Sequence, residues 1–269
     1  MEKVTKEKIE TKIILLFKLI RFAVSCRQEH TTPVFIMGYG RSGSSMLLRV
    51  FERDLHVKTY TENHPSVAQN FMLNYDRLYN TICRAKTKIV VFKPILNSFE
   101  AAKLLSEYPT GLVVWLIRDY QDVVASGLKK FGTKVGNYMK EYIETGLGDN
   151  WISKTMPSAT KKKIAQFIKG VELQEQDWMA LVWWAVNYTI ISEKLVEKNN
   201  IIFVRYEELV SNPDKVLKKI YNNIGLSYKK TLGKFIHKKS IGKGRTIHLN
   251  NIIKQMCTDL ENEIRLTIS

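Results

Sequence analysis

The sequence predicts an α/β protein in which a mostly parallel sheet is covered by helices on both faces. Short apolar runs rich in β-branched residues alternate along the chain with longer segments of helical periodicity, which is the pattern of repeated βαβ units. The chain has 269 residues, of which 45% are hydrophobic and 25% charged, as in one globular domain of ordinary size. We therefore expect three layers, helices, sheet and helices, built around one continuous sheet.

The expected strands are apolar runs that follow one another between helical segments. In chain order they are 33–37 (PVFIM), 56–60 (HVKTY), 88–92 (KIVVF), 112–117 (LVVWLI) and 201–205 (IIFVR). The expected helices are 44–54, 66–80, 98–107, 120–130, 173–198 and 213–224; the second of these starts at a Pro65–Ser66 helix-start signal. Residues 132–170 break the alternation with several glycines, Pro157 and the lysines 161–163, so we expect loops and short helices there, over the carboxyl edge of the sheet.

The first thirty residues are expected to form a helical extension (1–30) ahead of a single domain (31–269). Residues 13–24 are rich in Ile, Leu and Phe, but Lys18 and Arg21 interrupt them, and the stretch is too short and too charged to span a membrane. We expect a helix packed on the domain, with peripheral membrane contact through residues 9–24 as the alternative. No signal-peptide cleavage site is evident. Three widely spaced cysteines (Cys26, Cys83, Cys257) favour a reducing compartment, so the expected location is cytoplasmic or at the periphery of a membrane.

The net charge of +16 indicates anionic partners. The basic residues are scattered and form no recognised nucleic-acid motif, so nucleic acid is not expected as a partner. Many of the lysines are explained equally well as a solvated surface. The oligomeric state is left open by the sequence.

A glycine-rich turn follows the first strand in residues 34–49 (VFIMGYGRSGSSMLLR). Strand, turn and helix N-terminus in this order form a cradle for an anion, because successive N–H groups converge and the helix dipole favours negative charge. The spacing from Gly38 to Gly43 fits half of a P-loop, which predicts a P-loop nucleoside-triphosphate-hydrolase-like fold. Ser44 stands where such a hydrolase needs lysine, and Arg41 supplies a basic residue inside the loop instead. We therefore expect a phosphate loop that does not hydrolyse nucleoside triphosphates.

A second motif lies in residues 112–132, where a strand ends at Arg118 and Ser126 follows eight positions later on the next helix. Open α/β sheets bind ligands at the carboxyl ends of strands, where Arg118 offers a charged fork to a phosphate. GYGRSGSS and this segment together resemble the 5′-phosphosulfate loop and the 3′-phosphate segment of sulfotransferases that use 3′-phosphoadenosine 5′-phosphosulfate (PAPS). The arginine-bearing loop is similar to those of carbohydrate-type and bacterial-type members. The resemblance spans residues 33 to 248 and includes the basic loop 239–248.

The resemblance implies a set of functional residues. For PAPS these are Gly40, Arg41, Ser42, Gly43, Ser44, Ser45, Arg118 and Ser126, with Lys243, Gly244 and Arg245 closing over the 3′-phosphate. Arg41 is expected to stabilise charge rather than to donate a proton, because its pKa stays high. Lys93 is expected to contact the transferring sulfonate. The base that takes the acceptor's proton is expected to be Glu62, with His64 as the alternative.

The predicted reaction moves a sulfonate from PAPS to an acceptor hydroxyl by in-line displacement, without a metal. Carbohydrate or lipid-linked hydroxyls are weakly favoured, and the sequence does not name the acceptor. One alternative is a small-molecule or nucleotide kinase, because Gly38–Gly43 and the strand ending at Asp119 mimic the two phosphate and magnesium motifs of such enzymes. Another is a nucleotide-binding protein of the same fold without catalytic activity.

Overall fold

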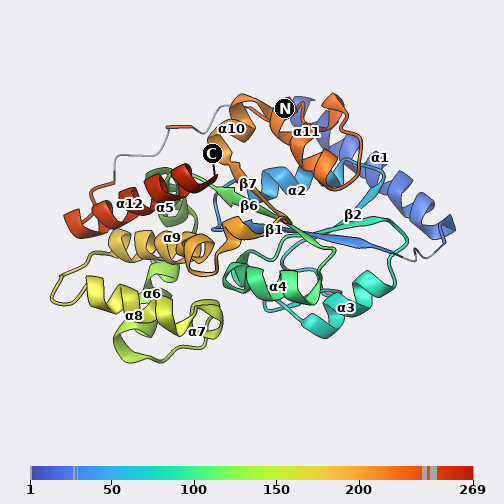
Figure 1. Cartoon of the computed structure of the whole chain (residues 1–269). Coiled ribbons are helices and arrows are strands. Elements are labelled where there is room, and N and C mark those ends of the chain that lie inside the picture. Colours follow the sequence, from blue (N-terminus) through green and yellow to red (C-terminus); the bar gives the residue numbers. More distant parts are fainter. Residues whose placement is uncertain (1, 27, 29, 238–240, 243–246, 269) are drawn as a thin grey trace.

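The computed structural model describes residues 2–26, 28, 30–237, 241–242 and 247–268. Five parallel strands form its main sheet in the order β2-β5-β1-β6-β7 (Figure 1). They are β1 (Thr32–Gly38), β2 (Val57–Tyr60), β5 (Ile89–Phe92), β6 (Leu112–Ile117) and β7 (Ile201–Arg205). Each expected strand is confirmed to within one residue at either end, and so is the α/β class.

The central strands are buried on both faces, which explains their continuous apolar sequences. Every residue of β5 and β6 is buried, as are the last six of β1. Successive side chains of a strand point to opposite faces. Val34 and Ile36 therefore belong to one hydrophobic core, whereas Phe35 and Met37 belong to the other. One sheet thus separates two cores.

Helices cover both faces, as expected for three layers (Figure 1). One core is closed by the helices α2 (Ser44–Glu52), α10 (Tyr206–Ser211) and α11 (Pro213–Asn223). The other, larger core is closed by α3 (Tyr75–Cys83), α4 (Ala101–Glu107), α5 (Tyr120–Phe131), α9 (Glu175–Ser192) and α12 (Asn251–Ile268). The helices α6 (Lys134–Thr145), α7 (Trp151–Thr155) and α8 (Ser158–Phe167) add to this larger core, in the region where loops and short helices were expected.

The helix predicted over residues 66–80 is wrong in its first half. Residues 68–73 form a two-stranded hairpin, β3 (Ala68–Gln69) with β4 (Met72–Leu73), and α3 begins only at Tyr75. Both loop residues, Asn70 and Phe71, have positive φ (50° and 64°), as a tight hairpin turn requires. Asn74 then caps α3, because its side chain accepts a hydrogen bond from the backbone N–H of Arg77 at 3.0 Å.

Other helix boundaries differ less from expectation. The segment predicted as one helix over 173–198 ends as α9 at Ser192, because Lys194 adopts a left-handed conformation before a 3₁₀ turn, η2 (Leu195–Glu197). A second 3₁₀ turn, η1 (Ile95–Glu100), precedes α4, and a third, η3 (Lys230–Leu232), follows α11. Helix α12 was not predicted.

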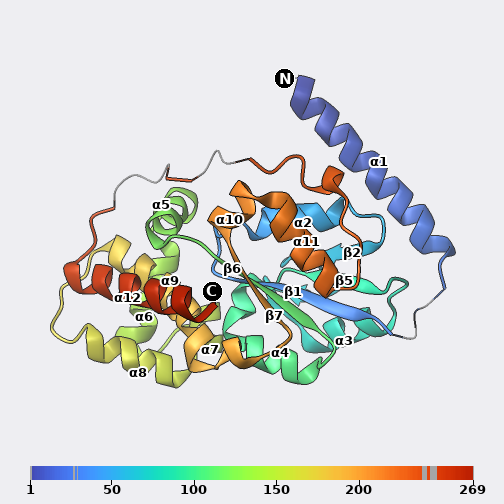
Figure 2. The same cartoon turned by 45° about the horizontal axis from the view of Figure 1, so that its top comes forward.

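The expected N-terminal helix is present as α1 (Glu2–Val24). It lies outside the three layers and projects beyond the rest of the domain at its N-terminal end (Figure 2). Among the residues that the structure describes, no helix has the length and apolar character needed to cross a membrane.

The strand order creates a topological switch point at the carboxyl edge of the sheet. From β1 the chain continues to β2 at one edge, whereas from β6 it continues to β7 at the other edge. The loops after the neighbouring strands β1 and β6 therefore diverge, and open α/β sheets bind their ligands at such a switch point. Arg41 lies in the first loop and Arg118 in the second.

Candidate active site

The loop after β1 has a backbone that only glycine can adopt at two positions. Gly38 has φ +110°, and a Cβ there would lie 2.3 Å from the carbonyl oxygen of Leu116 on the neighbouring strand. Gly43, the N-cap of α2, has φ +94°, and its Cβ would lie 2.7 Å from the Tyr206 ring. Arg41 between them also has a positive φ of 72°. This loop leads directly into the N-terminus of α2, whose first N–H groups lack partners within the helix.

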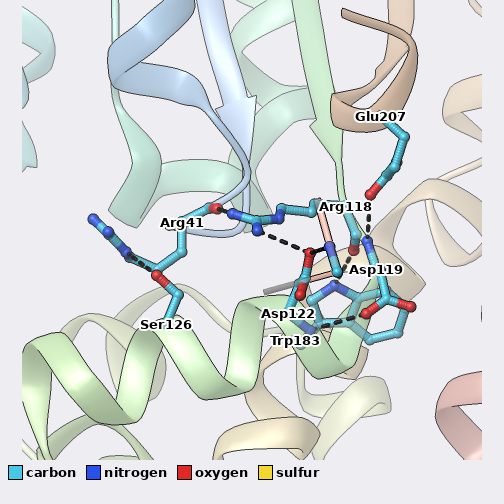
Figure 3. A network of polar contacts seen from close by, with 8 residues as sticks. Arg41, Arg118, Asp119, Asp122, Ser126, Trp183 and Glu207 are labelled. Atoms are coloured by element: carbon cyan, nitrogen blue, oxygen red, sulfur yellow. Dashed lines mark hydrogen bonds and ion pairs between the residues drawn. The ribbon is translucent and has the colours of Figure 1, made fainter. Parts of the chain in front are cut away.

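Residues from both loops and from α5 meet beside this cradle (Figure 3). The Nε of Arg41 donates a hydrogen bond to the Oγ of Ser126 on α5 at 2.9 Å. Arg118 donates from Nη1 to the backbone carbonyl of Arg41 at 3.1 Å. The sequence motifs, 77 residues apart at the two arginines, are thus brought together by the parallel pairing of β1 with β6. Arg41, Arg118 and Ser126 are therefore neighbours, and the Arg118 guanidinium contacts the backbone rather than the side chain of Arg41.

Arg118 is buried and held on several sides. Its Nη2 forms an ion pair with Asp122 one turn along α5 at 2.9 Å, and its guanidinium carbon lies 4.3 Å from the centre of the Tyr206 ring. Its carbonyl accepts a hydrogen bond from the Trp183 indole at 3.0 Å. Asp122 was not among the residues expected from the sequence, although its i,i+4 spacing from Arg118 was an available signal. Tyr206 was expected to organise the end of its strand, and its contact with Arg118 becomes apparent only in the fold.

Asp122 also contacts the basic loop 239–248. Its Oδ2 accepts a hydrogen bond from the backbone N–H of Gly242 at 3.3 Å. One carboxylate therefore joins Arg118 to a residue of the basic loop. The expected donor-binding residues Lys243, Gly244 and Arg245 lie outside the described residues.

A second polar cluster lies at the ends of β2 and β5. These strands pair so that Tyr60 stands opposite Phe92, which brings the following residues Glu62 and Lys93 together. The Lys93 ammonium contacts both carboxylate oxygens of Glu62, at 2.6 and 2.8 Å, and donates a hydrogen bond to the Oγ of Ser45 at 3.1 Å. Lys93 is only 7% exposed, whereas the Glu62 side chain is 29% exposed. Lys93 thus connects the candidate base to the cradle.

His64 lies in the turn after β2. Its Nδ1 accepts a hydrogen bond from the backbone N–H of Ser66 at 3.2 Å, and its ring packs edge-on against Tyr60. Partial burial, and to a lesser degree the charge of Lys58, lower the pKa of His64, so the imidazole is neutral at pH 7. These contacts match the turn-stabilising role that a histidine beside Pro65 can play.

A narrow crevice lies beside the Lys93–Glu62 pair and is too small in this structure to hold a water molecule. Most of its wall is apolar, and it runs along the hairpin β3–β4. The lining comprises Tyr60, Thr61, Glu62, Val67, Ala68, Phe71, Leu73, Phe92, Lys93 and Pro94. Phe71, at the tip of the hairpin, is 53% exposed. Within the described part of the chain no group of three or more His, Cys, Asp or Glu side chains could hold a metal ion.

The match to a family model extends well beyond the two motifs. Residues 31–266 match the family model of the sulfotransferase domain. The chain belongs to the sulfotransferase family. This confirms the resemblance drawn from the loop at Arg41 and the segment at Arg118. It also favours sulfonate transfer over the kinase alternative.

Solved structures of other sulfotransferases share the fold at low identity. A sulfotransferase from Mycobacterium avium, STF9, is 10% identical with a TM-score of 0.50 over 89% of this chain and 77% of that chain. One from Alicyclobacillus acidocaldarius is 12% identical with a TM-score of 0.49 over 88% and 94%. No curated protein matches the sequence. The roles of individual residues in this sulfotransferase therefore rest on its own geometry.

Proposed function

We propose that this sulfotransferase moves a sulfonate from PAPS to an acceptor hydroxyl by in-line displacement. The observation that carries the proposal is the convergence of Arg41, Arg118 and Ser126 at the switch point, with Lys93 bonded to Ser45 of the same cradle. This arrangement offers positive charge and hydroxyl donors to an anionic donor molecule. The contacts of Arg118 and Lys93 with carboxylates fix the positions of their charges before the donor binds. Charges fixed in advance stabilise the transition state most effectively.

The donor's two anionic ends fit two parts of this site. The 5′-phosphosulfate fits the cradle of residues 40–45, because this loop leads into the N-terminus of α2, where backbone N–H groups and the helix dipole favour an anion. The 3′-phosphate fits Arg118 and Ser126, which lie across the switch point on the loop after β6 and on α5. The basic loop that includes Lys243, Gly244 and Arg245 would add charge from the opposite side. Asp122 would hold Arg118 in place for this contact.

The chemistry needs a base and charge stabilisation. The acceptor oxygen attacks sulfur, the bond from sulfur to the bridging phosphate oxygen breaks, and the products are a sulfate ester and 3′-phosphoadenosine 5′-phosphate. Glu62 would take the acceptor's proton, and its position at the crevice and its contact with Lys93 support this role. The Lys93 ammonium would stabilise the sulfonate oxygens, and Arg41 the charge that develops on the departing phosphate. The contacts of His64 within its own turn make it the weaker candidate.

The acceptor is proposed to carry an apolar group next to its hydroxyl. The crevice beside Glu62 is lined largely by apolar side chains such as Val67, Phe71 and Leu73, and it would have to widen at the hairpin to admit an acceptor. Among the expected acceptor classes, the lining therefore favours lipid-linked hydroxyls over free carbohydrate.

Calorimetric titration with 3′-phosphoadenosine 5′-phosphate, without magnesium, tests the donor site. We expect micromolar binding, and a loss of about tenfold to a hundredfold in affinity for Arg118→Ala, as for a lost hydrogen bond to a charged group. Arg265→Ala, which removes an exposed arginine on α12, is the matched control and should bind normally. A preference for ATP with magnesium would favour the kinase. The protein would instead be a binding protein if it bound the bisphosphate tightly but transferred no sulfonate from PAPS to any of the hydroxyl-bearing lipids tested.

A further inference from the structure

Helix α1 contacts the domain through its polar side. Three of its charged side chains, spaced so that they share one face of the helix, bond to α2 and the loop that follows it. The contacts are Glu10 Oε2 with Arg53 Nη2 at 3.3 Å, Lys18 Nζ with the carbonyl of Phe51 at 3.1 Å, and Arg21 Nη2 with His56 Nδ1 at 3.0 Å. Lys18 is 6% exposed, so an ammonium group is buried beneath the helix.

Within residues 10–24, seven large apolar side chains of α1 are exposed to solvent, Leu15 and Leu19 among them. The other five recur at positions i, i+3, i+4, i+7 and i+11, which form one continuous face of a helix. This apolar stripe consists of Ile13 (48% exposed), Leu16 (57%), Phe17 (58%), Ile20 (55%) and Val24 (79%). Contiguous exposed patches of this kind are rare on monomeric proteins and mark interaction sites.

The orientation of α1 is costly for the protein alone. Burying the Lys18 ammonium removes it from water, and exposing the apolar stripe leaves five large side chains in water. If burial of apolar surface alone held α1, its apolar face would contact the domain and its charged side chains would face the solvent. Three specific polar contacts nevertheless fix the helix with its stripe outward. A partner that covers the apolar stripe would remove these side chains from water and so offset the cost of this orientation.

We propose that the apolar stripe of α1 inserts into the surface of an anionic lipid bilayer. The helix packs on the domain through residues 10–21 and projects beyond it at its N-terminal end, so its exposed apolar side chains are accessible to a bilayer surface (Figure 2). Basic side chains accompany the stripe: Lys12 and Arg21 are exposed on α1, and Lys86 donates from Nζ to the carbonyl of Ala23 near its end. Together with the net charge of +16, they match the negative surface of anionic lipids.

Charge also decides between a bilayer and a second copy of the chain. Two copies joined through α1 would bring together two proteins that each carry +16, and like charges repel. An anionic surface turns the same charge into attraction. The inference rests on α1 alone and does not depend on whether PAPS is the donor.

Vesicle flotation of the full chain tests the proposal. We compare vesicles of phosphatidylcholine alone with vesicles that also contain phosphatidylserine, and expect binding to the mixed vesicles to be stronger by about tenfold or more. The double substitution Leu16→Ser, Phe17→Ser should abolish this binding. The matched control Leu147→Ser, Phe167→Ser removes an exposed leucine and phenylalanine elsewhere and should bind as the unaltered protein does.

Two further measurements test the proposal, and the first uses only the unaltered protein, so it stands even if the α1 variant folds poorly. Amide hydrogen exchange of α1 should slow on addition of mixed vesicles and stay unchanged with phosphatidylcholine alone. Sedimentation should give a monomer, or an oligomer that the Leu16→Ser, Phe17→Ser substitution does not disrupt. Equal binding to both kinds of vesicle, no protection of α1, or a dimer that depends on Leu16 and Phe17 would each overturn the proposal.

Discussion

Replacement of Gly43 by alanine tests whether the cradle depends on a close approach of backbone and aromatic ring. Gly43 has φ 94° and ψ 8°, a left-handed conformation that costs an L-residue about 1–2 kcal/mol. Its new Cβ would also lie 2.7 Å from the buried ring of Tyr206, and such overpacking costs about 1–3 kcal/mol. We therefore expect Gly43→Ala to lower the free energy of unfolding by about 2–5 kcal/mol.

Gly146→Ala is the control for this prediction. Gly146 has nearly the same backbone conformation, φ 75° and ψ −2°, but its Cβ would meet only the end of the Lys161 side chain, at 3.2 Å. Both substitutions remove the same entropy from the unfolded chain, so that contribution cancels. Gly146→Ala should cost about 1–2 kcal/mol, which leaves about 1–3 kcal/mol for the contact with Tyr206.

Two assays read the outcome. Urea unfolding gives the loss of stability, and titration with 3′-phosphoadenosine 5′-phosphate gives donor affinity at a temperature where both variants are folded. Gly43→Ala should weaken donor binding by about tenfold or more, because the shifted loop no longer presents its N–H groups together, whereas Gly146→Ala should bind normally. Equal losses of stability together with normal binding by Gly43→Ala would refute the argument.

The remaining predictions concern the base, the buried lysine and the hairpin. Glu62→Gln should retain bisphosphate binding and lower kcat by about 100-fold or more, and an unchanged kcat would rule Glu62 out as the base. Burial lowers the pKa of Lys18 to about 8 from 10.5 in the unfolded chain, so unfolding takes up a proton between these values and stability rises with pH across this window. Lys18→Met should flatten that rise, seen by urea unfolding at pH 7 to 10.5; a slope equal to that of the unaltered protein would contradict it. Phe71→Gly removes a left-handed aromatic residue, so stability should stay within about 1 kcal/mol while KM for an apolar acceptor increases. A loss above about 2 kcal/mol, or an unchanged KM, would count against the proposed role of the hairpin.

The sheet could be predicted from sequence because its strands are buried on both sides. A run such as residues 112–117 has no polar position to accommodate, so composition alone identifies it. The helix expected over 66–80 failed for a different reason. The apolar residues of 67–73 are compatible with either structure, and the left-handed turn at Asn70–Phe71 lacks the glycine that usually signals a hairpin.

The candidate site was predicted in part. Arg41, Arg118 and Ser126 stand in local motifs, and the structure places them in contact. The division into residues 1–30 and 31–269 and the roles of the individual site residues stay predictions. Asp122 was missed although it belongs to the same helix as Ser126, because an aspartate in a first helical turn usually serves the helix dipole.

The sequence by itself determined the family, the glycine-rich loop after β1 and the five strands, because each rests on residues that are neighbours along the chain. Only the tertiary structure decided which distant residues share a surface. The bond of Lys93 to Glu62 and Ser45 follows from the pairing of β2 with β5 and from the position of α2 beside them. The orientation of α1 likewise depends on partners more than thirty residues away, at Phe51 and His56. Periodicity reveals that a helix has an apolar face, whereas the contacts made by its other face decide where that apolar face points.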